Sequence, residues 1–238
     1  MKKILIPVFC FILGHTILHA QKTIQDANVA NRNLSGFHGI QMQDGIDLYL
    51  TQSDKEAVSV SASSTAYRDK ISTEVENGIL KIRFTDKNHW LSNLGNHKLK
   101  AYVSIKTIDQ LRSSGGADVY IDEKLQASKL HIQLSGGSDL VGTLIVDDLS
   151  FEASGGSDAK ISGSAKHAII GISGGSDFKG YDFNIENCTI NASGGSDANI
   201  QVNKELISHT SGGSDICYQG NASTKSSSSG GGSLKKRN

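Results

Sequence analysis

A five-residue segment, Ser-Gly-Gly-Ser-Asp, recurs along the chain every 18 to 21 residues. The first copy is Ser114-Gly-Gly-Ala-Asp118, full copies begin at Ser135, Ser154, Ser173, Ser193 and Ser211, and a degraded copy begins at Ser229. A period of this length is about one turn of a β-solenoid, in which each coil packs on its neighbours and all coils share one core. The repeat therefore predicts an all-β parallel β-helix.

The residues on either side of the motif alternate between apolar and polar, which indicates β-strands. With the first Ser as position 0, the apolar positions −5, −3, −1, +5 and +7 share one parity. Because successive strand residues point to opposite faces, we expect these positions to face a common interior and the Asp at +4 to face water. A glycine pair weakens a strand, so we also expect a bend at the motif. Candidate core residues include Val119, Ile121, Leu130, Ile132, Leu134, Leu149, Phe151, Ile161, Ile170, Ile172, Ile190 and Ile200.

Stacking would align the motif aspartates of successive coils in a ladder, about 4.8 Å apart. The ladder consists of Asp118, Asp139, Asp158, Asp177, Asp197 and Asp215. Two ways of offsetting the charge repulsion stay open. Nearby Ser hydroxyl and backbone N–H groups could donate hydrogen bonds to the carboxylates, or a row of Ca²⁺ ions could bind them, since Ca²⁺ prefers carboxylate and carbonyl oxygens. The match to calcium-binding nonapeptide solenoids is weak, because the period here is doubled and a Gly is missing.

The first serine of each motif belongs to the outward parity. These serines are Ser135, Ser154, Ser173, Ser193 and Ser211. Together with the motif glycines and aspartates they predict a long flat surface that could contact a glycan, peptidoglycan or a second copy of the chain.

The two ends of the chain differ from the repeat. Residues 34–108 lack the motif but contain short alternating strands, and Asn77-Gly78 between two of them is a strong hairpin signal. We expect this part to form a β-rich N-terminal cap that covers the open end of the solenoid. The predicted organisation is a signal peptide at 1–20, a linker at 21–33, the cap at 34–108, the repeat solenoid at 109–222 and a mobile Ser/Gly-rich tail at 223–238.

The leader predicts export. Lys2 and Lys3 precede an apolar run that ends at Leu18, followed by Ala20, which is the pattern of a cleaved secretory signal. Its removal leaves 22 basic against 24 acidic residues, so no basic stripe favours a nucleic-acid partner. No later stretch approaches the roughly 18 apolar residues of a membrane span. Cys188 and Cys217 occupy different repeat phases, which predicts two separate, mostly buried thiols.

These features together resemble the putative auto-transporter adhesin family with a head GIN domain, found in exported proteins of Gram-negative bacteria. The resemblance rests on Phe37-His-Gly-Ile40, Gly45-Ile-Asp-Leu48, Val75-Glu-Asn-Gly-Ile-Leu-Lys-Ile82 and the serial motifs, over roughly residues 34–220. It implies a right-handed β-helix and a cell-envelope, surface or extracellular location. It brings no catalytic residues with it.

No catalytic set stands out from the sequence. Serines are so abundant that a Ser/His/Asp triad could be assembled by chance. His89 and His97 share a loop with Trp90, but two histidines without a third ligand are usually solvated. His131, His167 and His209 have the outward parity and are expected on the surface.

Two classes of function follow. The favoured one is an exported, non-enzymatic adhesin or envelope-binding protein without a cofactor, Ca²⁺ excepted, whose partner is a glycan or another envelope component. The alternative is a β-helical polysaccharide lyase or hydrolase, which needs clustered carboxylates or a basic residue in a groove. The regular spacing of one Asp per coil favours the first.

Overall fold

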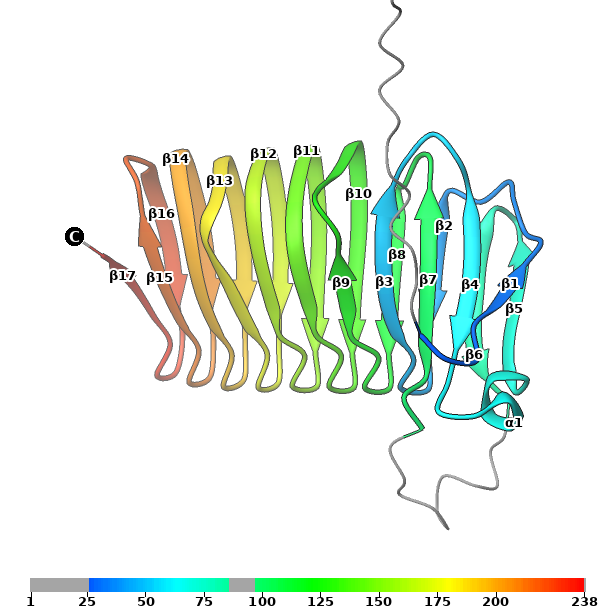
Figure 1. Ribbon diagram of the computed structural model, residues 1–238. Coiled ribbons are helices and arrows are strands. Elements are labelled where there is room, and N and C mark those ends of the chain that lie inside the picture. The colour runs from blue at the N-terminus through cyan, green and yellow to red at the C-terminus, as the bar shows by residue number, and fades with distance from the viewer. Residues whose placement is uncertain (1–25, 86–96, 238) are drawn as a thin grey trace, which may run out of the picture.

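The chain forms one long parallel β-solenoid of about seven turns (Figure 1), and the computed structural model describes residues 26–85 and 97–237. The only helix in these ranges is the short α1 (Thr65–Arg68). The all-β parallel solenoid predicted from the repeat is confirmed. The strands are β1 (Ala30–Arg32), β2 (Gly39–Met42), β3 (Asp47–Gln52), β4 (Ala57–Ser61), β5 (Ile71–Glu76), β6 (Ile79–Phe84), β7 (Lys100–Ile105), β8 (Gln110–Ser114), β9 (Val119–Ile121), β10 (Leu125–Ser135), β11 (Leu140–Ser154), β12 (Ala159–Ile172), β13 (Asp177–Ala192), β14 (Asp197–Thr210), β15 (Asp215–Gln219), β16 (Ser223–Ser228) and β17 (Ser233–Lys236).

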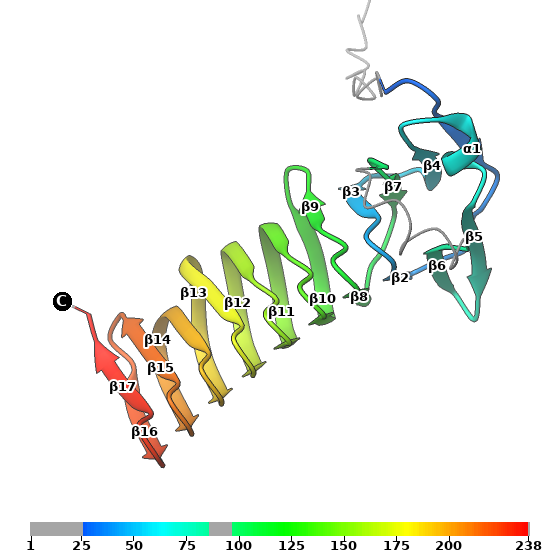
Figure 2. The same cartoon turned by 90° about the horizontal axis from the view of Figure 1, so that it is seen from below.

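Each coil of the body contains a tight turn at the motif and a long strand that leads to the next motif (Figure 2). We call the surface formed by residues before the motif the pre-turn face, and the surface formed by residues after it the post-turn face. Leu134 pairs with Ala153 before the motif, and Leu140 pairs with Ala159 after it. Equivalent residues therefore lie over each other from coil to coil, as the repeat predicts.

The core is a single apolar column inside the coils. The predicted inward positions are buried on both sides of the motif, from Leu130 and Ile132 in β10 to Ile200 in β14. Phe151 and Phe178 meet inside the column edge to face, with their ring centroids 5.0 Å apart. The inward parity holds on both sides of the motif but shifts at the bend in the middle of each long strand, as between Val146 and Leu149 in β11 and between Ala165 and Ala168 in β12.

The N-terminal third differs from the predicted cap because part of it is a coil of the solenoid. Strand β2 pairs in parallel with both β6 and β8, and β3 pairs in parallel with both β7 and β9. The β2–β3 coil therefore lies between two segments that follow it in the chain. Stacking in space does not follow chain order here, and the local sequence carries no signal for this interleaving.

The end of the solenoid is closed by strands that run against the stack. Strand β4 is antiparallel to β1 and β7, and β5 is antiparallel to β6. The predicted hairpin is confirmed: Asn77 and Gly78 join β5 to β6 with φ of 52° and 76°, the positive values that a type I′ turn requires. Strand β1 lies within the segment expected to be a linker.

The C-terminal segment, expected to be a mobile tail, instead adds a further coil. Strand β16 pairs with β14 and β17 pairs with β15, both in parallel. Backbone hydrogen bonds are enough to continue the stack, because they do not depend on apolar side chains. The inward positions Thr224, Ser226 and Ser228 are exposed, since no later coil in the described part covers them. This coil is a polar end to the column.

Some predictions lie outside the described residues. These are the signal peptide at 1–20, the first residues of the linker, and His89 and Trp90 of the polar loop. Within residues 26–85 and 97–237, no helix has both the length and the apolar character that a membrane crossing requires.

Candidate functional site

The motif turns adopt two conformations along the solenoid. In the copies at Ser114, Ser135 and Ser154 both glycines have positive φ, as in a type I′ turn. From Ser173 onward only the first glycine does, as in a type II′ turn. The first glycine is the crowded one in both forms. A Cβ on Gly155 would lie 3.3 Å from the backbone nitrogen of Gly136 in the preceding coil.

The second serine of each motif is a fully buried structural residue. In the first copies its backbone N–H donates to the serine Oγ of the next coil, from Ser138 to Ser157 and from Ser157 to Ser176, at 3.1 Å each. In later copies the hydroxyl instead donates within its own turn, as from Ser214 Oγ to the Ser211 carbonyl at 3.0 Å. These serines satisfy backbone groups that the turn leaves unpaired. They are not available to a ligand.

The aspartates form the predicted ladder, and backbone hydrogen bonds link successive carboxylates. The N–H of Asp158 donates to Asp139 Oδ1 and the N–H of Asp177 to Asp158 Oδ1, both at 3.1 Å. Similar bonds join Asp139 to Asp118 and Asp215 to Asp197. Hydrogen bonds to the ionised carboxylate offset part of the repulsion between the coils. One of the two predicted ways of stabilising the ladder is thus present.

Sequence reasoning missed a further rung, Asp47. Leu48 pairs with Val119, which places Asp47 beside Asp118, and Asp44 and Gly45 provide the positive φ of the motif glycines. Gln43-Asp44-Gly45-Ile46-Asp47 is thus a degraded motif that shares little with the others beyond one Gly and the final Asp. Burial, followed by the negative charge of Asp118, raises the pKa of Asp47.

We expect Asp47→Asn to stabilise the protein at neutral pH. The pKa of Asp47 in the folded protein lies above the ordinary value of 3.8, so ionising this carboxyl group costs stability. The cost begins as pH rises past 3.8 and is complete above the folded-state pKa. Asn keeps an acceptor for the backbone N–H of Asp118 but carries no charge. We expect thermal melts to show a Tm about 1–2 °C higher at pH 7 and no gain near pH 3. A gain of equal size at both values would contradict this account.

The geometry does not yet select a cation for the ladder. Among the residues that the structure describes, no group of three or more His, Cys, Asp or Glu side chains is arranged to hold a metal ion. Lys179 Nζ lies 3.2 Å from Asp158 Oδ2 and 3.4 Å from Asp177 Oδ2, so an ammonium group already balances the negative charge of these two carboxylates. Binding of Ca²⁺ to Asp118, Asp139, Asp158, Asp177, Asp197 and Asp215 stays a prediction.

A shallow groove follows the pre-turn face beside the motif turns. It consists of two adjoining hollows of about 300 and 380 Å³ that share Asn191 and Ser193. We call it the pre-turn groove. Of the predicted ligand serines, Ser154, Ser173, Ser193 and Ser211 line it and are half-buried, whereas Ser135 lies outside its lining. The outward residues two positions before each serine complete it: Gln133, Glu152, Gly171, Asn191, His209 and Ser227.

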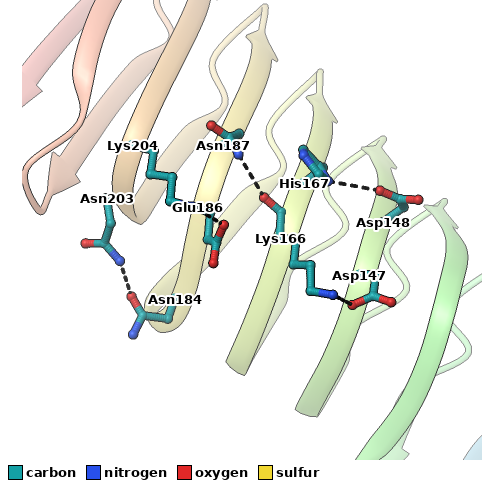
Figure 3. A network of polar contacts seen from close by, with 9 residues as sticks. All are labelled: Asp147, Asp148, Lys166, His167, Asn184, Glu186, Asn187, Asn203 and Lys204. Carbon is teal, nitrogen blue, oxygen red and sulfur yellow. Dashed lines mark hydrogen bonds and ion pairs between the residues drawn. The ribbon is translucent and has the colours of Figure 1, made fainter.

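The bend in the middle of the long strands carries an alternating row of charges (Figure 3). Asp147 pairs with Lys166 of the next coil, and Glu186 with Lys204 of the coil after it, each at 2.7 Å. Lys204 lowers the pKa of Glu186, and Asp147 raises the pKa of Lys166. These pairs are exposed, so each contributes little to stability. Their alternation favours the correct coil register, since a slip would place like charges together.

The histidines lie where their repeat phases predict, whereas of the two cysteines expected to be mostly buried only Cys188 is. His131, His167 and His209 point outward and contact Ser150, Asp148 and Ser227 of adjacent coils, at 3.2, 3.2 and 2.7 Å. Cys188 and Cys217 are separate free thiols. Cys188 is in the core, where burial raises its pKa to about 12, and Cys217 faces outward. His97 packs on Tyr67, with ring centroids 4.0 Å apart.

The post-turn face carries a stack of tyrosines that sequence reasoning did not single out. Tyr49 lies between Tyr102 and Tyr120, with ring centroids 5.1 and 5.2 Å apart. Tyr102 donates a hydrogen bond of 2.5 Å to Asp26, and burial together with this bond raises the pKa of Tyr102 to about 12. The aspartate ladder runs two residues before this row. The signal was present as tyrosines at equivalent outward positions of three different strands.

Comparisons with known proteins agree with this architecture. The family model described as "Putative auto-transporter adhesin, head GIN domain" matches residues 36–222. None of the curated proteins compared with the chain matches it.

Several solved structures share the fold at low identity. A putative adhesin from Bacteroides fragilis is 19% identical, with a TM-score of 0.79 over 88% of this chain and 96% of the other. A putative adhesin from Parabacteroides distasonis is 17% identical, with a TM-score of 0.71 over 88% and 96%. A putative lipid binding protein from the same species is 21% identical, with a TM-score of 0.69 over 88% and 96%.

Proposed function

Because the chain belongs to the family described as putative auto-transporter adhesins with a head GIN domain, we propose that it is an exported, non-catalytic adhesin that binds an extended glycan along the pre-turn groove. The leader at residues 1–20 supports export to the periplasm, the outer-membrane surface or the extracellular space. The single observation that carries the choice of ligand is the groove that runs across successive coils and combines serine hydroxyls and amides with apolar lining.

The lining of the pre-turn groove suits a neutral, hydroxyl-rich chain. It offers amides from Gln133 and Asn191, the imidazole of His209 and one serine hydroxyl per coil. Backbone N–H and C=O groups in the sheet are paired between coils, so recognition falls to these side chains. The repeat of about 4.8 Å between coils is close to the length of one sugar in an extended polysaccharide.

One apolar side chain flanks the groove and adds a second type of contact. Ile169 is 60% exposed and lies two residues before Gly171 on the same outward face. Isolated exposed apolar residues are common, but this one borders the part of the groove that Gly171 leaves open. It can pack against the apolar face of a sugar ring while the neighbouring serines and amides bind hydroxyl groups.

The same lining argues against the enzyme alternative. Glycoside hydrolysis uses a pair of carboxylates on either side of the scissile bond, and a lyase needs a positioned base. Glu152 is the only carboxylate among the residues that line the two hollows. The ladder aspartates lie across the motif turn from the groove and occupy equivalent positions in each coil. Binding without chemistry is therefore the better account of this surface.

A glycan array tests the proposal. Residues 21–238 and the Gly171→Gln variant would be screened side by side, in Ca²⁺ and in EDTA. A Cβ on Gly171 meets only Glu152 Cγ and the Phe151 carbonyl, both at 3.9 Å, so the variant should fold while its side chain fills the groove. We expect the wild type to bind one class of linear glycan and Gly171→Gln to bind it at least about ten-fold more weakly.

Gly175→Gln is the matched control. A Cβ on Gly175 would have no neighbour within 4 Å, and Gly175 lies outside the groove lining, so this variant should bind like the wild type. Equal binding by wild type and Gly171→Gln would contradict the assignment of the groove. Release of shortened oligosaccharides from a bound polysaccharide would instead support the lyase or hydrolase. Binding that disappears in EDTA would support the calcium ladder.

A further inference from the structure

The ladder aspartates differ in how their charge is balanced: among the described residues, Asp158, Asp177 and Asp215 pair with a lysine, whereas Asp118, Asp139 and Asp197 do not. Toward the C-terminus, Lys179 pairs with Asp158 and Asp177, and Lys235 lies 3.6 Å from Asp215. Toward the N-terminus, no described Lys, Arg or His forms an ion pair with Asp118 or Asp139. Each of these two accepts one backbone N–H at Oδ1, and Asp118 Oδ2 also accepts a hydrogen bond of 3.4 Å from the Tyr120 hydroxyl. Asp139 Oδ2 has no partner in the described part of the chain.

This difference in charge balance arises from the outward-facing residue that lies two positions after each aspartate. In order along the solenoid these residues are Tyr120, Val141, Lys160 and Lys179. Lys179 can neutralise its own aspartate and that of the preceding coil because its stem lies along the sheet. At the equivalent places beside Asp118 and Asp139 the chain has Tyr120 and Val141, which have no positive charge. Lys160 makes no ion pair with Asp139 in the described structure.

Tyr120 and Val141 form an exposed apolar surface at this point. They are 39% and 44% exposed and lie side by side on neighbouring coils. Tyr49 stacks on one side of Tyr120, so the other side of this ring, toward Val141, is not covered by an aromatic neighbour. The stack already accepts a cation elsewhere, since Lys100 Nζ lies 5.7 Å from the centroid of Tyr49. Aromatic rings attract ammonium and guanidinium groups in this way.

We propose that Tyr120, Val141, Asp118 and Asp139 form a docking surface for a lysine or arginine side chain carried by an extended segment of a partner protein. The incoming cation takes the place on Asp118 and Asp139 that Lys179 takes on Asp158 and Asp177. Its aliphatic stem packs on Val141, and its charged end contacts the ring of Tyr120 and the free carboxylate oxygen of Asp139. This surface lies on the post-turn face, so it does not depend on the glycan proposal.

A cationic peptide provides the probe. Titration of residues 21–238 with the hexapeptide Lys-Thr-Lys-Thr-Lys-Thr, with Glu-Thr-Glu-Thr-Glu-Thr as its control, would be followed by calorimetry and by NMR. We expect saturable binding of the lysine peptide alone, weakened by added salt. Tyr120→Ala and Asp139→Asn should each weaken it at least about five-fold, and Tyr120→Phe should retain it because the ring remains. Asn at 139 keeps an acceptor for the N–H of Asp158.

Asp197→Asn is the matched control for charge alone. Asp197 is also a ladder carboxylate without an ion pair among the described residues, but the outward residue after it is Asn199 rather than an aromatic or aliphatic one. We expect this variant to bind the lysine peptide like the wild type. An equal loss in Asp197→Asn and Asp139→Asn would show diffuse attraction and overturn the proposal. Absence of binding, or unchanged binding by Tyr120→Ala in a variant with a wild-type melting curve, would overturn it too.

Discussion

Replacing Gly155 by Val should destabilise the protein far more than removing the carboxylate of Asp158 in the same motif. Gly155 has φ of +70°, and a Cβ there would lie 3.3 Å from the backbone nitrogen of Gly136. A β-branched residue is strained at this φ, and the backbone it meets cannot move without shifting a whole coil. We expect a loss of about 2–4 kcal/mol, which thermal melts should show as a Tm lower by about 5–15 °C.

The comparison variants separate backbone strain from other effects. Asp158→Ala removes the acceptor for the N–H of Asp177 and a partly exposed ion pair with Lys179, so it should cost no more than about 1.5 kcal/mol. Gly175→Val places the same side chain at the second glycine of the next motif, where φ is not positive and an added Cβ would have no neighbour within 4 Å. It should melt close to the wild type. A Tm lower for Asp158→Ala than for Gly155→Val would show that the turn tolerates side chains.

The stacking of the coils could be predicted because the repeat fixes which residues meet. Asp139, Asp158 and Asp177 are neighbours because apolar residues at the same parity occur in every coil, and only one register buries them all. The second motif serine follows the same rule and is buried, as at Ser157. The motif glycines do not follow it. Gly155 is exposed because the turn leaves the plane of the strands there, and parity resumes beyond it.

The ends of the solenoid could not be predicted in the same way. The place of the β2–β3 coil depends on pairing with β6 and β8 that is remote in sequence, and Asp47 lacks the serines that mark the other rungs. The last coil has polar inward residues such as Ser226, so apolar patterning stops before the backbone ladder does. Local patterns therefore underestimate a solenoid at both ends, where backbone hydrogen bonds extend the stack through coils whose motif is degraded.

The candidate binding surfaces depend on side chains from several coils, which the sequence does not place together. The pre-turn groove is open at Gly171 because that coil has a glycine where its neighbours have Glu152 and Asn191. The first serines of the motifs are predicted to form a flat surface, but their position beside these larger residues creates a hollow. The docking surface at Tyr120 arises in the same way, because Tyr120 and Val141 occupy positions equivalent to that of Lys179 but carry no positive charge. In a repeat protein the departures from the repeat are what distinguish one part of the surface from another.

The largest single loss from the core is expected for Phe178→Ala. Phe178 is fully buried in the apolar column and packs edge to face on Phe151. Truncation leaves a cavity that the stacked coils cannot close, because the backbone hydrogen bonds hold their spacing. We expect a loss of about 3–5 kcal/mol in denaturant unfolding. Lys179→Ala, which changes the adjacent outward side chain, should cost less than about 1 kcal/mol.

A second substitution tests whether the cavity is the cause. Gly180 is buried under the ring of Phe178, and a Cβ on it would lie only 2.5 Å from a ring carbon. Gly180→Ala should therefore destabilise the wild type by crowding the ring. In Phe178→Ala the ring is gone and the methyl group meets only the Asn199 carbonyl oxygen, at 3.3 Å, so its cost should fall, giving a coupling of about 1–2 kcal/mol between the two sites. Strictly additive losses would mean that Phe178 acts through strand propensity rather than through the space that its ring fills.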